Sequence, residues 1–145
     1  WDVIFLLAGV LPLGLALEQT GGAALLAAGA VSVVGALPPL FMLYLFYALA
    51  MVLTELISNN ATIVVLLPVA LASAATVGMS PYPLVLAVMF AASTSFMTPV
   101  GYQTNTMIYG PGGYRFLDFL RVGGPLNLLL WLVTPLYITW LWGLS

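Results

Sequence analysis

The sequence contains no cysteine and no histidine, and its only two cations are Arg115 and Arg121. Without thiols or imidazoles, the chain excludes disulfides, the usual zinc and haem ligands, and a hydrolytic triad that needs a histidine base. Two arginines form no basic surface for a phosphate backbone, so we expect no nucleic-acid partner. We expect neither an enzyme nor an organic cofactor.

Charge of either sign is scarce. Charged residues make up 4% of the 145 residues and hydrophobic residues 63%, whereas soluble domains carry about 25% charged residues. This composition predicts an all-α polytopic membrane protein with residues 1–145 as a single membrane domain. The chain begins at Trp1 and lacks a signal-peptide pattern, so we expect it to be the C-terminal half of a larger protein.

Apolar runs at residues 3–17 and 23–37 predict the first two helices. A Pro38-Pro39 pair ends the second run, because proline lacks the N–H that a helix interior needs. The next apolar run, residues 40–53, would cover only about 21 Å as a helix, less than the hydrocarbon core of about 30 Å.

A polar segment at residues 54–62, Thr-Glu-Leu-Ile-Ser-Asn-Asn-Ala-Thr, interrupts these apolar runs. Consecutive Ser and Asn side chains compete for backbone hydrogen bonds in a helix interior, but they favour helix N-caps. The pattern predicts a re-entrant helical hairpin at about residues 40–77, with the polar segment at its turn. The alternative is one long, kinked helix with a polar face. Exposed irregular backbone does not survive in lipid, so a polar turn there lies in protein or lines an aqueous cavity.

A second polar interruption follows at residues 95–106 and contains Pro99 and Gly101. Pro99 donates no hydrogen bond and would leave the Ser95 carbonyl unbonded in a continuous helix. We therefore predict a broken helix at about residues 83–109. Its polar side chains include Thr98, Gln103 and Asn105.

The C-terminal part predicts a short interfacial helix at about residues 114–121 and a last span at about residues 125–144. Both arginines lie in the interfacial helix. The positive-inside rule therefore places the Arg115–Arg121 connection in the cytoplasm and the C-terminus outside the cell membrane.

The two interruptions carry the groups that a small-ion site needs. Helix ends meeting at the polar turn would present partial negative charge from carbonyls and partial positive charge from N–H groups. If the first helix ends near Ile57, Thr54 and Ser58 share a face, and their oxygens with that of Asn59 suit an alkali cation. Ser58 and Asn60 can donate to an anion. No arginine lies near, so co-bound cations would supply the countercharge. The alternative is that these side chains only join neighbouring helices.

Glu55 is the one ionisable residue inside an apolar stretch, where such residues are costly and usually paired or functional. It would relay protons, help to hold a cation, sit protonated, or brace the turn by accepting backbone N–H bonds. The residues leave these alternatives open.

Three segments together resemble a known family: Thr54-Glu-Leu-Ile-Ser-Asn-Asn-Ala-Thr, Phe96-Met-Thr-Pro-Val-Gly-Tyr-Gln-Thr-Asn, and Tyr109-Gly-Pro-Gly-Gly-Tyr-Arg-Phe-Leu-Asp-Phe-Leu-Arg. The chain resembles the C-terminal half, the second inverted repeat, of divalent anion/sodium symporters, which carry citrate, dicarboxylates or sulfate. The resemblance implies an ion-transporter fold with a re-entrant hairpin and a broken helix meeting near the midplane.

The resemblance also implies roles for particular residues. Substrate would contact Ser58, Asn59, Asn60, Thr98 and Pro99. Sodium, the coupling ion, would bind Thr54, Asn59 and the backbone carbonyls of Ile57 and Met97. The chain has Asn60 where dicarboxylate carriers usually have Thr, so dicarboxylate specificity does not carry over. A homodimer with elevator-like alternating access in a lipid bilayer is implied as well.

We therefore expect sodium-coupled symport of a divalent anion, either sulfate or a di- or tricarboxylate. Proton coupling through Glu55 and arsenite-type export are alternatives within the same class. Two alternatives lie outside the transporter class. One is a structural membrane subunit, and the other is an ion channel, because Val100-Gly101-Tyr102 faintly matches a potassium-channel filter.

Overall fold

The computed structural model describes Pro12, residues 19–21 and residues 37–143. The spans expected at residues 3–17 and 23–37 lie outside this part of the chain, apart from Pro12 and Leu37. Residues 37–143 form five helices and, within that range, no strand. They are α3 (Pro39–Thr54), α4 (Asn59–Val77), α5 (Tyr82–Ala92), α6 (Gln103–Tyr109) and α7 (Phe116–Trp142).

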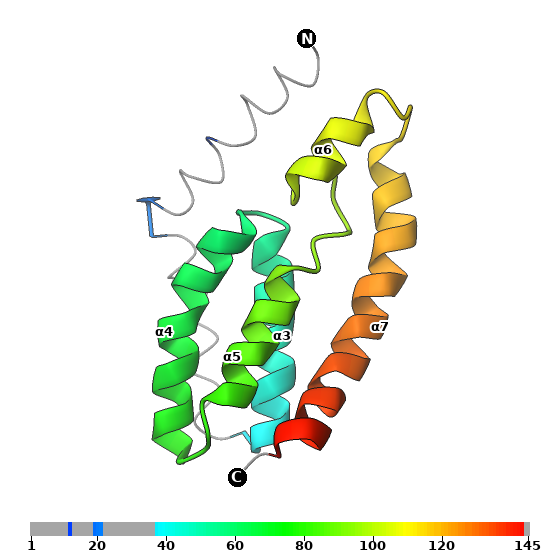
Figure 1. Ribbon diagram of the computed structural model, residues 1–145. Coiled ribbons are helices and arrows are strands. Elements are labelled where there is room, and N and C mark those ends of the chain that lie inside the picture. The colour runs from blue at the N-terminus through cyan, green and yellow to red at the C-terminus, as the bar shows by residue number, and fades with distance from the viewer. Residues whose placement is uncertain (1–11, 13–18, 22–36, 144–145) are drawn as a thin grey trace.

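Helices α3 and α4 form a hairpin whose turn is residues 55–58, which we call the tip (Figure 1). Pro39 starts α3, where its missing N–H costs nothing. Ser58 caps α4 by accepting the Ala61 N–H at 3.1 Å. Gly78 ends α4 in the left-handed conformation, with φ of 69°. The sequence therefore placed this hairpin well. That it is re-entrant in a membrane stays a prediction.

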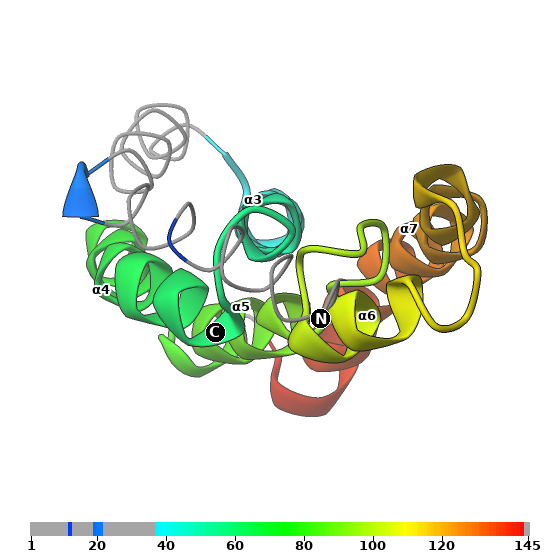
Figure 2. The ribbon, with the colours of Figure 1, turned by 90° about the horizontal axis from the view of Figure 1, so that it is seen from above.

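Helix α5 stops at Ala92, and α6 begins at Gln103. Residues 93–102 between them, which we call the break, form no regular helix. Seen from above, α6 lies beside α7 at one end of the group formed by α3, α4, α5 and α7 (Figure 2). The described part of the structure is thus helical, as predicted, and its backbone is irregular between α5 and α6.

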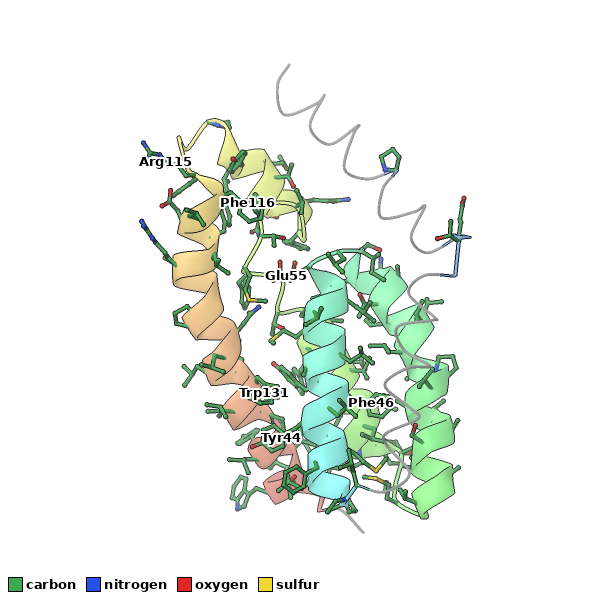
Figure 3. The ribbon with its side chains drawn as sticks, turned by 180° about the vertical axis from the view of Figure 1, so that it is seen from behind. Tyr44, Phe46, Glu55, Arg115, Phe116 and Trp131 are labelled. Atoms are coloured by element: carbon green, nitrogen blue, oxygen red, sulfur yellow. The ribbon has the colours of Figure 1, made fainter. Side chains whose placement is uncertain are left out.

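The core lies where α3 and α5 meet, with α4 and α7 packed against them (Figures 1 and 2). Helix α5 contributes small buried residues such as Ala87 and Ala91 to this core, and α3 contributes large ones such as Phe46 and Tyr47. On the other side, Trp131 of α7 donates its indole N–H to the Tyr44 carbonyl oxygen at 2.9 Å. Their rings meet edge to face (Figure 3). These contacts fix α7 to α3 below the tip.

Helix α7 corrects one expectation. We expected an interfacial helix at residues 114–121 and a separate span at residues 125–144, but one helix of 27 residues runs through Pro125. Its length of about 40 Å exceeds the hydrocarbon core of about 30 Å, which leaves the arginine-bearing first turns room to lie outside the core. Asp118 stabilises the start of the helix by accepting the Arg115 N–H at 2.7 Å.

In the described ranges, α7 is the one helix that is both long and apolar enough to cross a membrane. Most of its surface is exposed in this chain. Helices α3, α4 and α5 contain shorter apolar segments. Helix α3, with 16 residues, is about 24 Å long and shorter than the hydrocarbon core.

Candidate binding site

The fold brings the tip and the break into direct contact. The Glu55 carboxylate lies between them and accepts three hydrogen bonds. Its Oε1 accepts the Met97 N–H at 2.8 Å and the Asn127 side-chain N–H at 3.3 Å, and its Oε2 accepts the Thr98 hydroxyl at 2.7 Å. Figure 3 shows Glu55 at the end of α3, beside the segment between α5 and α6. Residues about 42 positions apart thus form one polar cluster.

These contacts match the bracing role considered for Glu55, since the carboxylate accepts a backbone N–H. The side chain is buried and 4% exposed. Each of the three donors is neutral, and hydrogen bonds from neutral donors stabilise a buried carboxylate in place of water. Proton relay through Glu55 stays a prediction.

Two of the predicted sodium ligands lie side by side. The Thr54 hydroxyl oxygen is 2.7 Å from the Asn59 side-chain oxygen and 2.7 Å from the Ala92 carbonyl oxygen. A hydroxyl has one proton, so it donates to one of these acceptors at a time. The arrangement collects three hard oxygens at the junction of α3, α4 and α5. Ile57, whose carbonyl was predicted as a ligand, is buried at the tip.

Thr54 and Ser58 do not share a helical face, contrary to the sequence expectation. Helix α3 ends at Thr54, three residues before the expected Ile57. Thr54 is fully buried, whereas Ser58 is exposed and caps α4. Asn59 is partly buried and Asn60 is exposed, both in the first turn of α4. The predicted anion contacts Ser58, Asn59 and Asn60 therefore cluster at a helix N-terminus, where the dipole favours negative charge.

The break is organised by side chains that reach its backbone. Asn105 donates its amide N–H groups to the carbonyl oxygens of Ser95 and Thr98, at 2.9 and 3.1 Å. The Thr106 hydroxyl donates to the Pro99 carbonyl oxygen at 2.6 Å. The Ser95 carbonyl, which would be unbonded in a continuous helix, is therefore bonded in the broken one. The Asn105 side chain thus bonds the carbonyl that a backbone N–H at position 99 would bond in a continuous helix.

Thr98 and Pro99, the predicted substrate residues of the break, face the protein interior through these bonds. Thr98 donates to Glu55 and accepts the Gly101 N–H at 2.9 Å. Pro99 is buried. A Cβ on Gly101 would overlap the Ser95 hydroxyl and lie 2.8 Å from Glu55 Oε2. Gly101 is therefore a packing residue of the tip–break contact, and this placement gives no support to the potassium-filter alternative.

Helix α7 holds the break from the other side through two residues that the sequence analysis missed. A Cβ on Gly123 would overlap the Phe96 carbonyl oxygen, so glycine is needed for this close approach. Asn127, one turn further along, is fully buried and reaches Glu55. Asn127 is the one amide in the apolar run from residue 125 to residue 144, and that isolation was the available signal.

Two buried side-chain oxygens, Thr62 Oγ1 and Asn127 Oδ1, have no hydrogen-bond partner within the described residues.

A cleft of about 380 Å³ lies beside the break, between α6 and the first half of α7. Its lining is mostly apolar and includes Phe96, Ile108, Phe119 and Leu126. Among the described residues, no group of three or more acidic or metal-binding side chains gathers. A cation at Thr54 and Asn59 would therefore be held by neutral oxygens, next in sequence to Glu55.

Comparison with known proteins identifies the class. An uncharacterized transporter of Synechocystis is 51% identical over 145 residues, which cover 100% of this chain and 24% of the relative. Sodium/sulfate cotransporter 1 of Chlamydomonas reinhardtii is 34% identical over 134 residues, which cover 92% of this chain and 15% of the relative. Sodium-dependent high-affinity dicarboxylate transporter 3 of Caenorhabditis elegans is 32% identical over 138 residues, which cover 95% of this chain and 24% of the relative. All three relatives are named as transporters.

The family follows from a direct match. A family model described as a citrate transporter matches residues 1–88, more than half of the chain. The chain belongs to this family and is of the divalent anion/sodium symporter type, as its motifs indicated. It spans a quarter or less of the length of the three relatives.

Proposed function

We propose that the chain forms half of the binding site of a sodium-coupled symporter for a divalent anion, either sulfate or a di- or tricarboxylate. The observation that carries the proposal is the contact of tip and break through Glu55. Oxygens that suit sodium (Thr54, Asn59) and the N-terminus of α4, which suits an anion, lie at the same place. Two relatives, named a sodium/sulfate cotransporter and a sodium-dependent dicarboxylate transporter, support sodium coupling and divalent anions.

Electrostatics supply a reason for coupling. Both arginines lie at the start of α7, and Figure 3 shows Arg115 away from Glu55. A divalent anion at the tip would meet the Glu55 carboxyl group, which repels an anion when it is ionised, and no described cationic side chain. Sodium bound at Thr54 and Asn59, with the carbonyls of Ile57 and Met97, would offset that repulsion. Anion affinity would therefore depend on sodium occupancy, which is thermodynamic coupling between two ligands.

The wider architecture belongs to the same proposal. The chain would be the second of two inverted repeats in a multi-pass cell membrane protein. The hairpin would be re-entrant and part of a domain that moves by alternating access. The start of α7 would lie in the cytoplasm, its exposed Trp140 and Trp142 would lie near the outer interface, and the whole transporter would be a homodimer.

Uptake into proteoliposomes tests the proposal with the full-length protein. Labelled sulfate, succinate and citrate are each offered with an inward sodium gradient or with potassium in its place. We expect sodium to drive accumulation of at least one anion, and Asn59→Ala and Thr98→Ala to abolish it at unchanged expression. Thr139→Val is the control, because the Thr139 hydroxyl bonds only within α7, to the Pro135 carbonyl.

A second candidate, proton coupling, rests on the buried carboxylate of Glu55. A pH gradient without sodium separates the two candidates. Accumulation driven by the pH gradient and lost in Glu55→Gln would replace sodium coupling by proton coupling. Uptake indifferent to both gradients would reject symport altogether.

A further inference from the structure

Asn127 is the one side chain of α7 that reaches the tip–break cluster by a hydrogen bond in the described residues. It is fully buried, and its amide N–H lies 3.3 Å from Glu55 Oε1, 72 positions away in sequence. The same oxygen accepts the Met97 N–H of the break. One carboxylate oxygen therefore joins α7, the tip and the break.

The orientation of the Asn127 amide is set by this contact. Were the amide reversed, its oxygen would face Glu55 Oε1, and two acceptors would repel each other. The amide oxygen instead points to a place where it has no partner within the described residues. Leaving a buried amide oxygen unpaired is costly. That Asn127 nevertheless keeps its N–H on the Glu55 carboxylate indicates that this bond determines how the amide is oriented.

The backbone supports the same contact one turn earlier. Gly123 lets α7 approach Phe96, and a Cβ there would also lie 2.9 Å from the Met97 nitrogen. Gly123 and Asn127 are separated by four positions, so they share one face of α7. This face touches the break at Phe96–Met97 and reaches Glu55 behind it.

We propose that Asn127 is a positioning residue that acts through Glu55: its amide holds the carboxylate, and the carboxylate holds Met97 and Thr98 of the break against the hairpin tip. This inference rests on the proposed function, because the positioned groups are those assigned to sodium and the anion. Loss of the Asn127 amide would leave the ligand groups present but misplaced. It would therefore weaken apparent sodium and anion affinity more than the maximal rate.

A thiol-accessibility experiment tests the positioning without any transport. The 145 residues contain no cysteine, so Ser95→Cys, at a buried position of the break, places one thiol in this part of the full-length protein. Cysteines elsewhere are replaced by serine. The rate of modification by a water-soluble maleimide is measured in membranes for Ser95→Cys alone and combined with Asn127→Leu, which is of similar volume.

We expect Asn127→Leu to raise the modification rate roughly tenfold, as the loss of a hydrogen bond to a charged group implies. Glu55→Ala should raise it at least as much. Adding Asn127→Leu to Glu55→Ala should change nothing further, because residues that act through one contact are not additive. Thr139→Val, on the same helix, should leave the rate unchanged.

Two outcomes overturn the inference. An unchanged rate in Asn127→Leu shows that the amide holds nothing in place. Rates that multiply in the double variant show that Asn127 acts without Glu55. If Asn127→Leu does not accumulate in the membrane, Asn127→Ala is read by the same criteria.

Uptake measured on the same variants separates this inference from the proposed function. If the modification rates are non-additive but the parent protein shows no sodium-driven uptake, the proposed function is rejected and the positioning role of Asn127 is supported. Normal sodium-driven uptake with an unchanged half-saturating sodium concentration in Asn127→Leu rejects the positioning alone.

Discussion

The tip at residues 55–58 and the break at residues 93–102 both interrupt apolar helices with polar residues, but they are stabilised differently. The backbone of the tip is stabilised locally: the Leu56 and Ile57 N–H groups donate to the Leu53 carbonyl, and Ser58 caps the helix that follows. The break is longer, and its backbone bonds to side chains from elsewhere: Glu55, Asn105 and Thr106. Local stabilisation tolerates single changes, whereas a segment held by distant side chains depends on each of them.

The largest effect is expected where α7 contacts the break. In Gly123→Ala the new methyl group would overlap the Phe96 backbone, which cannot rotate away as a side chain would. We expect a loss of about 1–3 kcal/mol of stability from overpacking, and loss of transport. Thermal unfolding in detergent and uptake are the measurements. The matched control is Gly124→Ala, whose methyl group would meet only Leu120, at 3.9 Å. Equal effects of the two variants would contradict the close contact.

An intermediate effect is expected from Asn105→Leu. This change removes the donor of two hydrogen bonds to the break, to the carbonyl oxygens of Ser95 and Thr98. A fully buried acceptor left unpaired costs about 1–3 kcal/mol; these bonds are only partly buried, so we expect a smaller loss and a moderate fall in the melting temperature. Gln103→Leu, at an exposed position two residues earlier, is the control. A melting temperature equal to that of the control would mean that α6 does not hold the break.

A smaller effect is expected at the tip. Ser58→Ala removes the cap of α4 and should cost about 1 kcal/mol of stability. Ser58→Thr keeps a capping hydroxyl and should recover most of the melting temperature. If Ser58→Ala destabilised the protein more than Asn105→Leu does, the contrast between a local tip and a distantly held break would be wrong.

The smallest effect on stability is expected for Asn60→Thr, because the side chain is exposed in the first turn of α4. The exchange replaces an amide by a hydroxyl at the place proposed to contact the anion. We expect an unchanged melting temperature and an altered ratio of sulfate to dicarboxylate uptake. An unaltered ratio would remove Asn60 from the proposed anion contacts.

The same contrast explains what the sequence could predict. Pro39, Ser58 and Gly78 each act within one turn of their own position, so the hairpin could be located from local pattern. The break could be located from Pro99. Its partners could not, because Glu55 is 42 positions from Met97 and Asn127 is 72 positions from Glu55. The motifs carried the family resemblance without predicting this geometry.

Helix α7 was mispredicted for a related reason. The Gly123-Gly124-Pro125 sequence favours a helix end when read locally. In the structure Gly123 packs on the break and Asn127 bonds Glu55, on the two sides of Pro125. Contacts with the neighbouring helices thus stabilise a helix that local propensity would interrupt.

The central claim is that sodium and the anion bind one site that the tip and the break form together. The most direct test measures anion affinity of the purified full-length protein, for the anion that is transported, as sodium is raised at constant ionic strength with potassium. We predict that affinity rises with sodium and that Asn59→Ala removes this dependence. An anion affinity that is the same with and without sodium would contradict the claim.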